Sequence, residues 1–277
     1  MTHNIATLLI LIFSLVGIFV GVLLNRAADN LPPPARRSFL ETPRCPYCNS
    51  PRPPGEQFGI VSFALRRDKC HQCSAPLKLR APLVELGTGA LFGFLASRFE
   101  FGMYLLALAF FTAILILIAV IDLEHKLILN TVSLPATIAA LIASPVVLAS
   151  PNGALNQLNW NLIILSALGA AVGYAITFGI YWLGVLFLQI VNRNRATKID
   201  TVAFGMGDVK LAGLLGALVG FPTIISVLVW TILLGGVGGA LIIVFQYVRR
   251  GSFARDTVMP YALYLILAGW AYMVFRF

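Results

Sequence analysis

The sequence predicts an all-α protein that crosses a membrane about eight times and carries one small polar domain in a loop. Hydrophobic residues make up 59% of the 277 residues and charged residues only 11%, which is unlike a soluble enzyme. The apolar residues occur in runs close to the length that crosses a bilayer's hydrocarbon core. Lipid offers backbone groups no other partner, so each run is expected to be helical. The predicted spans are 5–24, 82–98, 103–121, 131–149, 161–190, 208–220, 223–247 and 259–275.

Three of these runs need separate arguments. No basic residue precedes the run at 5–24, so we interpret it as a retained helix rather than a cleaved signal peptide. Two other runs are short, and each carries an acidic residue, Glu85 in one and Asp208 in the other.

The basic residues predict the orientation of the helices. Ten of the twenty Lys and Arg residues lie between the first two spans, and loops rich in these residues stay in the cytoplasm. Alternation from that loop leaves only Arg98 and Arg276 outside. Topology and contact with anionic membrane lipids therefore explain the net charge of +9, and no nucleic acid is expected as a partner.

The segment 25–81 is predicted to be a small cytoplasmic domain between the first helix, 1–24, and a transmembrane domain, 82–277. Two Cys-x-x-Cys pairs lie in it, Cys45 with Cys48 and Cys70 with Cys73. Their pattern is similar to that of a zinc ribbon. Two disulfides are the alternative, but cytoplasmic thiols stay reduced, which favours Zn²⁺.

A zinc ion held by four cysteines is expected to be structural. Four protein ligands leave no coordination position for an activated water. A short loop with few apolar residues also needs the stability that a metal supplies. His71 is a further candidate ligand of lesser weight.

Two acidic residues lie at predicted cytoplasmic helix ends, Asp122 in Val-Ile-Asp-Leu-Glu-His and Asp208 in Gly-Met-Gly-Asp-Val-Lys. Ionisable residues in such places are functional candidates. Taken singly, Asp208 has the alternative of a helix cap and Asp122 that of an ordinary interfacial charge. Gly205 and Gly207 allow a close backbone approach just before Asp208, and Asp122 is the predicted partner.

Two carboxyl groups held close together share a proton, because both cannot ionise cheaply. The ionised group then draws a proton from water while the protonated group polarises a peptide carbonyl. Such a pair hydrolyses peptides without a metal or a covalent intermediate. Glu85, Glu124 and His125 also lie near cytoplasmic helix ends, so the residues by themselves do not choose the pair.

Five pieces of the sequence occur in an order that matches one known family. They are Gly21-Val-Leu-Leu-Asn25 leading to Leu31-Pro32, the paired-cysteine loop, Pro82-Leu-Val-Glu85, Ile121-Asp122 running to Asn130, and Gly205-Met-Gly-Asp-Val-Lys210. Over nearly its whole length the chain resembles the bacterial type IV prepilin peptidases, intramembrane aspartyl peptidases with a Gly-x-Gly-Asp signature.

The resemblance implies an aspartic endopeptidase of the bacterial cytoplasmic membrane. Its expected substrates are type IV prepilins and pseudopilins, whose short basic leader is removed after a glycine at the cytoplasmic face. The resemblance implies that Asp122 and Asp208 are catalytic, and that Gly205, Gly207, Lys210 and Glu85 shape the site. It also implies N-methylation of the new N-terminus with S-adenosylmethionine, for which the sequence identifies no binding residues.

The chain departs from the family at several places. Arg66-Arg67-Asp68-Lys69-Cys70 lacks the glycine that relatives have before the second cysteine pair, so peptidase activity without methylation is an alternative. Asn30 stands where relatives often have arginine, and Leu129 where they often have proline. The stretch between the two aspartates is extended by the polar segment Gln189 to Thr201.

Other function classes remain as alternatives. A proton-coupled transporter would suit many spans with intramembrane acids, but the sequence has no repeat and no pair of interrupted helices. An assembly platform that docks a secretion partner would not need the aspartates. Within the enzymes, a preflagellin peptidase has the same signature, but the cysteine loop argues for prepilins.

Overall fold

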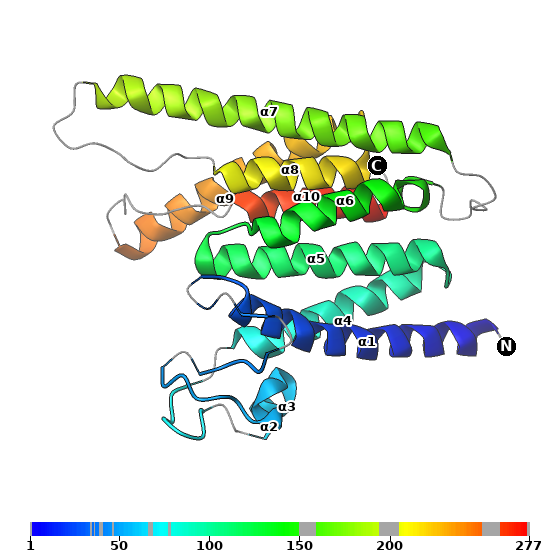
Figure 1. The fold of residues 1–277 in the computed structure, drawn as a ribbon, viewed down its shortest axis with the longest axis vertical. Coiled ribbons are helices and arrows are strands. Elements are labelled where there is room, and N and C mark those ends of the chain that lie inside the picture. The colour runs from blue at the N-terminus through cyan, green and yellow to red at the C-terminus, as the bar shows by residue number, and fades with distance from the viewer. Residues whose placement is uncertain are drawn as a thin grey trace. The chain divides into compact units, whose positions relative to one another are not determined.

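The computed structural model describes residues 2–33, 35, 37–38, 41–45, 47–65, 69–76, 79–149, 159–193, 205–250 and 261–275. The chain forms two compact units, 1–125 and 126–277, and each is described by itself (Figure 1). Within the described residues every regular element is a helix, and the only extended pairings are two isolated β-bridges. The prediction of an all-α fold is confirmed.

Three long helices form the membrane part of the first unit: α1 (Thr2–Asn30), α4 (Arg80–Arg98) and α5 (Met103–His125). Helix α1 packs closely along α4 because glycine lets the backbones approach. A Cβ added at Gly21 would lie 2.6 Å from the Cα of Glu85. Four residues later, the Asn25 side chain donates a hydrogen bond of 2.9 Å to the carbonyl of Ala81. The motif around Gly21 thus holds the start of α4.

Helix α1 runs to Asn30, six residues beyond the predicted end of the first span. Asn25, Ala27, Ala28 and Asn30 are all buried, so packing rather than apolarity extends this helix. The loop that follows contains two short helices, α2 (Pro54–Gln57) and α3 (Gly59–Ala64), which the sequence did not predict.

The second unit contains α6 (Asn130–Val147), α7 (Trp160–Asn192), α8 (Met206–Val219), α9 (Thr223–Arg250) and α10 (Tyr261–Phe275). Helix α8 contacts all the other four, and every residue from Leu211 to Val219 is buried. Its contact with α7 is close enough for the Ser166 hydroxyl to donate 2.7 Å to the Ala217 carbonyl. Helix α8 is therefore enclosed by the other helices of this unit along most of its length.

Each of the eight predicted spans coincides with a helix. Five of them, α1, α5, α6, α7 and α9, are long and apolar enough to cross a membrane. Helix α10 is apolar but has only 15 residues, and α4 and α8 are not among the five. The protein is a multi-pass membrane protein, and the number eight stays a prediction.

Candidate active site and metal centre

Each Cys-x-x-Cys pair forms a tight knuckle. Cys45 N–H donates to the Ser50 carbonyl and the Cys45 carbonyl accepts from Asn49, both at 2.9 Å. The second knuckle repeats this pattern: Cys70 N–H donates to Ala75, and Ser74 N–H to the Cys70 carbonyl, again at 2.9 Å. In both, the residue after the second cysteine is left-handed, with φ 57° at Asn49 and 56° at Ser74. Local turn chemistry thus folds the two pairs alike.

The two knuckles bring their four sulfurs together. Sγ atoms of Cys45 and Cys73 lie 3.7 Å apart, and those of Cys48 and Cys70 lie 3.8 Å apart. Zinc–sulfur bonds of about 2.3 Å in a tetrahedron place sulfurs about 3.8 Å from one another. A disulfide needs about 2.05 Å, and all four cysteines are free. The residues fit a four-thiolate zinc ion and not a disulfide.

Hydrogen bonds and the repulsion between neighbouring sulfurs shift the pKa values of these thiols in different directions. Backbone N–H groups of Cys73 and Gln72 lower the pKa of the Cys70 thiol to about 6, and the Ser50 hydroxyl lowers the pKa of Cys48. The Ala75 N–H acts to lower the pKa of Cys73, but desolvation and the neighbouring sulfurs raise it to about 12. A cation among the sulfurs removes this repulsion, which is the electrostatic reason for a metal here.

His71, the lesser candidate ligand, is engaged elsewhere. Its Nδ1 lies 3.2 Å from Oε1 of the buried Glu56, which also accepts from the His71 backbone N–H at 3.2 Å. Glu56, Cys70 and His71 are close enough together to form a second group of ligand atoms. The four sulfurs form a complete set without His71.

Glu85 attaches the cysteine loop to the membrane helices. Its side chain is 1% exposed, and its two oxygens accept hydrogen bonds from the backbone N–H groups of Gly59 at 2.7 Å and Ile60 at 2.8 Å. These donors begin α3, where the helix dipole favours a negative charge. Both carboxylate oxygens are thus used in holding a helix end.

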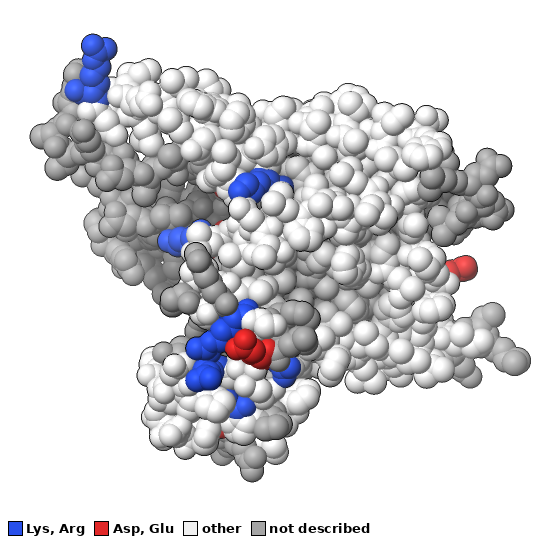
Figure 2. Space-filling view, in the orientation of Figure 1, with Lys and Arg blue, Asp and Glu red and all other residues white. Residues whose placement is uncertain are grey.

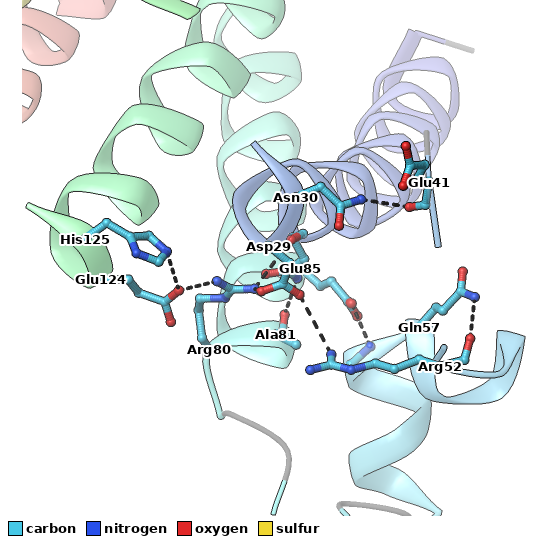
Figure 3. Close-up of polar contacts among 12 residues, drawn as sticks. Asp29, Asn30, Glu41, Arg52, Gln57, Arg80, Ala81, Glu85, Glu124 and His125 are labelled. Atoms are coloured by element: carbon cyan, nitrogen blue, oxygen red, sulfur yellow. Dashed lines mark hydrogen bonds and ion pairs between the residues drawn. The ribbon is translucent and has the colours of Figure 1, made fainter. Parts of the chain in front are cut away.

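Arg80 joins three helices of the first unit (Figure 3). Its guanidinium donates to Asp29 Oδ1 at 2.7 Å, to the Asn25 carbonyl at 3.4 Å and to Glu124 Oε2. Arg80 and Asp29 were missed in the sequence because 51 positions separate them. The available signal was a basic residue two positions before the start of the 82–98 span.

Asp122 lies in the last turn of α5, two residues before Glu124. Its side chain is half-buried, and within the described residues no hydrogen bond or ion pair involves it. A carboxyl group there faces the negative end of the helix dipole. Arg80 compensates Glu124, but no described cation pairs with Asp122. An uncompensated acid in this position is a functional candidate.

Asp208 lies in the first turn of α8, half-buried. Its Oδ2 accepts a hydrogen bond of 3.1 Å from the N–H of Gly205, the N-cap residue. The helix cap considered for Asp208 is therefore present. As a cap, the Asp208 carboxyl group lies at the positive end of the α8 helix dipole, which stabilises a carboxylate. Tyr261, at the start of α10, interacts electrostatically with Asp208 and was not identified from the sequence.

The segment before α6 lies against the start of α8, entirely within the second unit. A Cβ added at Gly207 would meet Ile128 Cβ at 3.0 Å. Lys210 Nζ donates a hydrogen bond of 2.6 Å to Asn130 Oδ1. The spacing of Gly-x-Gly-Asp-Val-Lys thus brings Gly207 and Lys210 against Ile128 and Asn130, which follow Asp122 in the chain.

Two departures from the family pattern have simple structural settings. Asn30 donates to the carbonyls of Ser38 at 3.2 Å and Glu41 at 2.8 Å, so it closes the turn after α1. Leu129 is the N-cap of α6 with φ −73°, which is also a proline value. The missing glycine among Arg66, Arg67 and Asp68 lies outside the described residues, as does 194–201 of the predicted extension.

Comparisons with known proteins agree with these features. The profile of the type IV leader peptidase family matches residues 109–240, and that of the bacterial peptidase A24 N-terminal domain matches residues 14–99. The chain is also similar to several relatives that bear the name prepilin leader peptidase/N-methyltransferase. The Stutzerimonas stutzeri protein is 30% identical, covering 92% of this chain and 86% of its own length. The Pseudomonas aeruginosa protein is 29% identical (92% and 87%), and the Bacillus subtilis protein 28% (79% and 75%). No solved structure matches.

Proposed function

Since the chain belongs to the type IV leader peptidase family, we propose that it removes the leader from type IV prepilins and pseudopilins with Asp122 and Asp208 as its catalytic pair. The family membership makes the chain a peptidase. The observation that carries the assignment of the pair is the contact of Gly207 with Ile128 at the start of α8.

Chain connectivity supports this pair. Ile128 follows Asp122 by six residues, and six residues reach at most about 20 Å. Lys210 is hydrogen-bonded to Asn130 in the same stretch. This short connection along the chain supports the proposal that both carboxyl groups act on one peptide bond.

The helix ends give the two aspartates different electrostatic settings. The positive end of α8 stabilises a carboxylate at Asp208, whereas the negative end of α5 does not stabilise a charge at Asp122. A pair in which one group is ionised and the other protonated is what the reaction needs. Asp208 takes a proton from the attacking water, and Asp122 donates a hydrogen bond to the scissile carbonyl.

The substrate class comes from the family, and the predicted topology supports it. The basic loop of the chain marks the cytoplasmic side, and both aspartates belong to helix ends on that side. A precursor anchored by its hydrophobic helix presents its leader junction at this surface. Cleavage after a glycine in the cytoplasmic membrane of a bacterium is the activity that we assign.

Methylation is the second proposed activity, since the relatives are named as N-methyltransferases. S-adenosylmethionine supplies an electrophilic methyl group on a sulfonium; the neutral N-terminal amine attacks it, and the C–S bond breaks to leave a thioether. The protein must hold the donor beside that amine and accept the amine's proton.

Zinc has a structural role in this proposal. The four sulfurs fix the two knuckles, and Glu85 holds α3 to α4. Zinc thereby positions the loop on the end of the membrane helices, and no step of peptide hydrolysis passes through it.

The test is prepilin cleavage in membranes, followed by mass spectrometry of the product. Asp122→Asn and Asp208→Asn are each expected to slow leader removal by about 10²–10⁴-fold. Glu100→Gln, an exposed acid after α4, is the matched control and should cleave like the wild type. Normal cleavage by either aspartate variant would show that the pair is wrong.

A further inference from the structure

Two helices of the second unit begin at the same end of that unit, α8 at Met206 and α10 at Tyr261 (Figure 1). They contact each other, and α9, which reverses the chain between them, packs against both. Asp208 in the first turn of α8 and Tyr261 are therefore placed at one end of the same helix pair. The proposed function uses Asp208 and gives Tyr261 no role.

The packing of α8 against α10 sets the register of these two residues. A Cβ added at Gly269 would lie 2.5 Å from Leu215 Cδ2, so Gly269 and Leu215 lie at one level. Asp208 precedes Leu215 by seven residues, and Tyr261 precedes Gly269 by eight. Because both helices rise by about 1.5 Å per residue, Asp208 and Tyr261 lie at nearly the same level as well. Seven residues are close to two full turns, so Asp208 lies on the face of α8 that packs against α10.

Two glycines of α9 make room for the tyrosines of α10. A Cβ added at the buried Gly235 would lie 3.7 Å from Tyr261 Cε2. A Cβ added at Gly238 would collide with the hydroxyl of Tyr264, one turn further along α10. The Tyr264 hydroxyl thus lies against the backbone of α9, whereas Tyr261 interacts electrostatically with Asp208. The two tyrosines have the same chemistry and differently placed hydroxyl groups.

The surroundings of Asp208 within the second unit hold few other titratable groups. Figure 2 shows that the described helix surfaces in view carry hardly any charge. Helix α6 and residues 223–245 of α9 contribute no titratable side chain. The described groups on the remaining elements near the start of α8 are Tyr174 and Tyr181 on α7, Lys126 before α6, Lys210 on α8 and Tyr264 on α10. Both α7 tyrosines stack on Phe178, and Lys210 is hydrogen-bonded to Asn130. A carboxylate in apolar surroundings is stable only when hydrogen-bond donors reach it.

We infer that Tyr261 is a positioning residue for Asp208: its hydroxyl donates a hydrogen bond to the carboxylate, keeps it ionised and directs it at the attacking water. The N–H of Gly205 already holds Oδ2, and a donor from α10 fixes the rotation of the carboxylate group. Hydrogen bonds to a carboxylate favour its charged form, and those of an active site tighten when the substrate binds. The inference rests on the proposed function, in which Asp208 is the base, and adds a residue to that site.

The test is the pH dependence of prepilin cleavage in membranes by the wild type, Tyr261→Phe and Tyr264→Phe. Phenylalanine keeps the ring on Gly235 and removes only the hydroxyl. The acid limb of the kcat/KM profile reports protonation of the base in the free enzyme. In Tyr261→Phe this limb should move to higher pH by about one unit, because the charged form has lost a donor, while KM changes little. Tyr264→Phe removes the same atom one turn away and should keep the wild-type profile.

The outcomes separate this inference from the proposed function. A wild-type pH profile for Tyr261→Phe overturns the inference and makes Tyr261 an interfacial anchor of α10. Equal shifts in the two variants overturn it as well, because they arise from packing on α9. Loss of cleavage by Tyr261→Phe at every pH also overturns it, since one hydrogen bond to the base does not carry the whole reaction. Normal cleavage by Asp208→Asn is the separate result that overturns the proposed pair, and the inference with it.

Discussion

Lys210 Nζ donates a hydrogen bond of 2.6 Å to Asn130 Oδ1, which joins the first turn and a half of α8 to the first residue of α6. The bond spans 80 positions of the sequence. It links the two motifs that contain the proposed catalytic aspartates, and it lies wholly within the second unit.

The link predicts non-additive effects at its two ends. Lys210→Ala and Asn130→Ala should each lower the rate of prepilin cleavage, because either change removes the hydrogen bond between the start of α8 and the first residue of α6. The double variant should be no slower than the slower single variant, since both remove one interaction. Leader removal measured for the four proteins gives the coupling, and strictly additive losses would contradict the link.

Gly207 is predicted to tolerate a side chain poorly. Gly207→Ala places a Cβ 3.0 Å from Ile128 Cβ, and such overpacking costs about 1–3 kcal/mol. Gly207→Val should reduce cleavage more than Gly207→Ala does. The control is Gly87→Ala, where a Cβ would meet nothing within 4 Å, and its thermal stability and activity should match the wild type.

Glu85 is predicted to act on the cysteine loop rather than on the substrate. In Glu85→Gln an amide NH₂ faces one of the two N–H groups at the start of α3, which leaves a buried donor unsatisfied. The free energy of unfolding should fall by about 1–3 kcal/mol as a result. Limited proteolysis should cut residues 25–81 faster while cleavage of prepilin is largely retained. Complete loss of cleavage with an intact loop would instead place Glu85 in the catalytic reaction.

Zinc binding is predicted to weaken as the pH falls. Thiolates bind the metal, so protons compete with it. At neutral pH the Cys73 thiol, whose pKa is about 12, is protonated and must lose its proton to bind zinc. Below about pH 6 the Cys70 thiol, whose pKa is about 6, is protonated as well and must also lose a proton. The apparent affinity, measured by competition with a chromophoric chelator, should therefore fall more steeply below about pH 6. An affinity independent of pH would exclude thiolate ligation.

Removal of the metal is expected to unfold the loop and leave the membrane helices folded. A chelator, or Cys48→Ser, should make the loop sensitive to protease. Far-ultraviolet circular dichroism should change little, because α2 and α3 contain only 4 and 6 residues. Complete loss of helix signal would mean that zinc stabilises the entire first unit.

The sequence by itself determined the membrane class, the all-α fold, the four cysteines as a metal set and the family. These depend on local composition, on short spacings and on motif order, which are visible in one dimension. Asn49 and Ser74, for example, form their turns by donating backbone hydrogen bonds to Cys45 and Cys70, within six positions of the chain.

Only the tertiary structure decided how distant polar residues are used. Glu85 proved to hold the start of α3, Asn30 to close the turn after α1, and Arg80 to bind Asp29 and Glu124. Helix α8, a weak span by prediction because it is short and carries Asp208, has every residue from Leu211 to Val219 buried. Burial and ion pairing across 44 or 51 positions, as for Arg80 with Glu124 and Asp29, depend on helix packing. Helix packing depends on all side chains at once, so no local pattern in the sequence encodes these contacts.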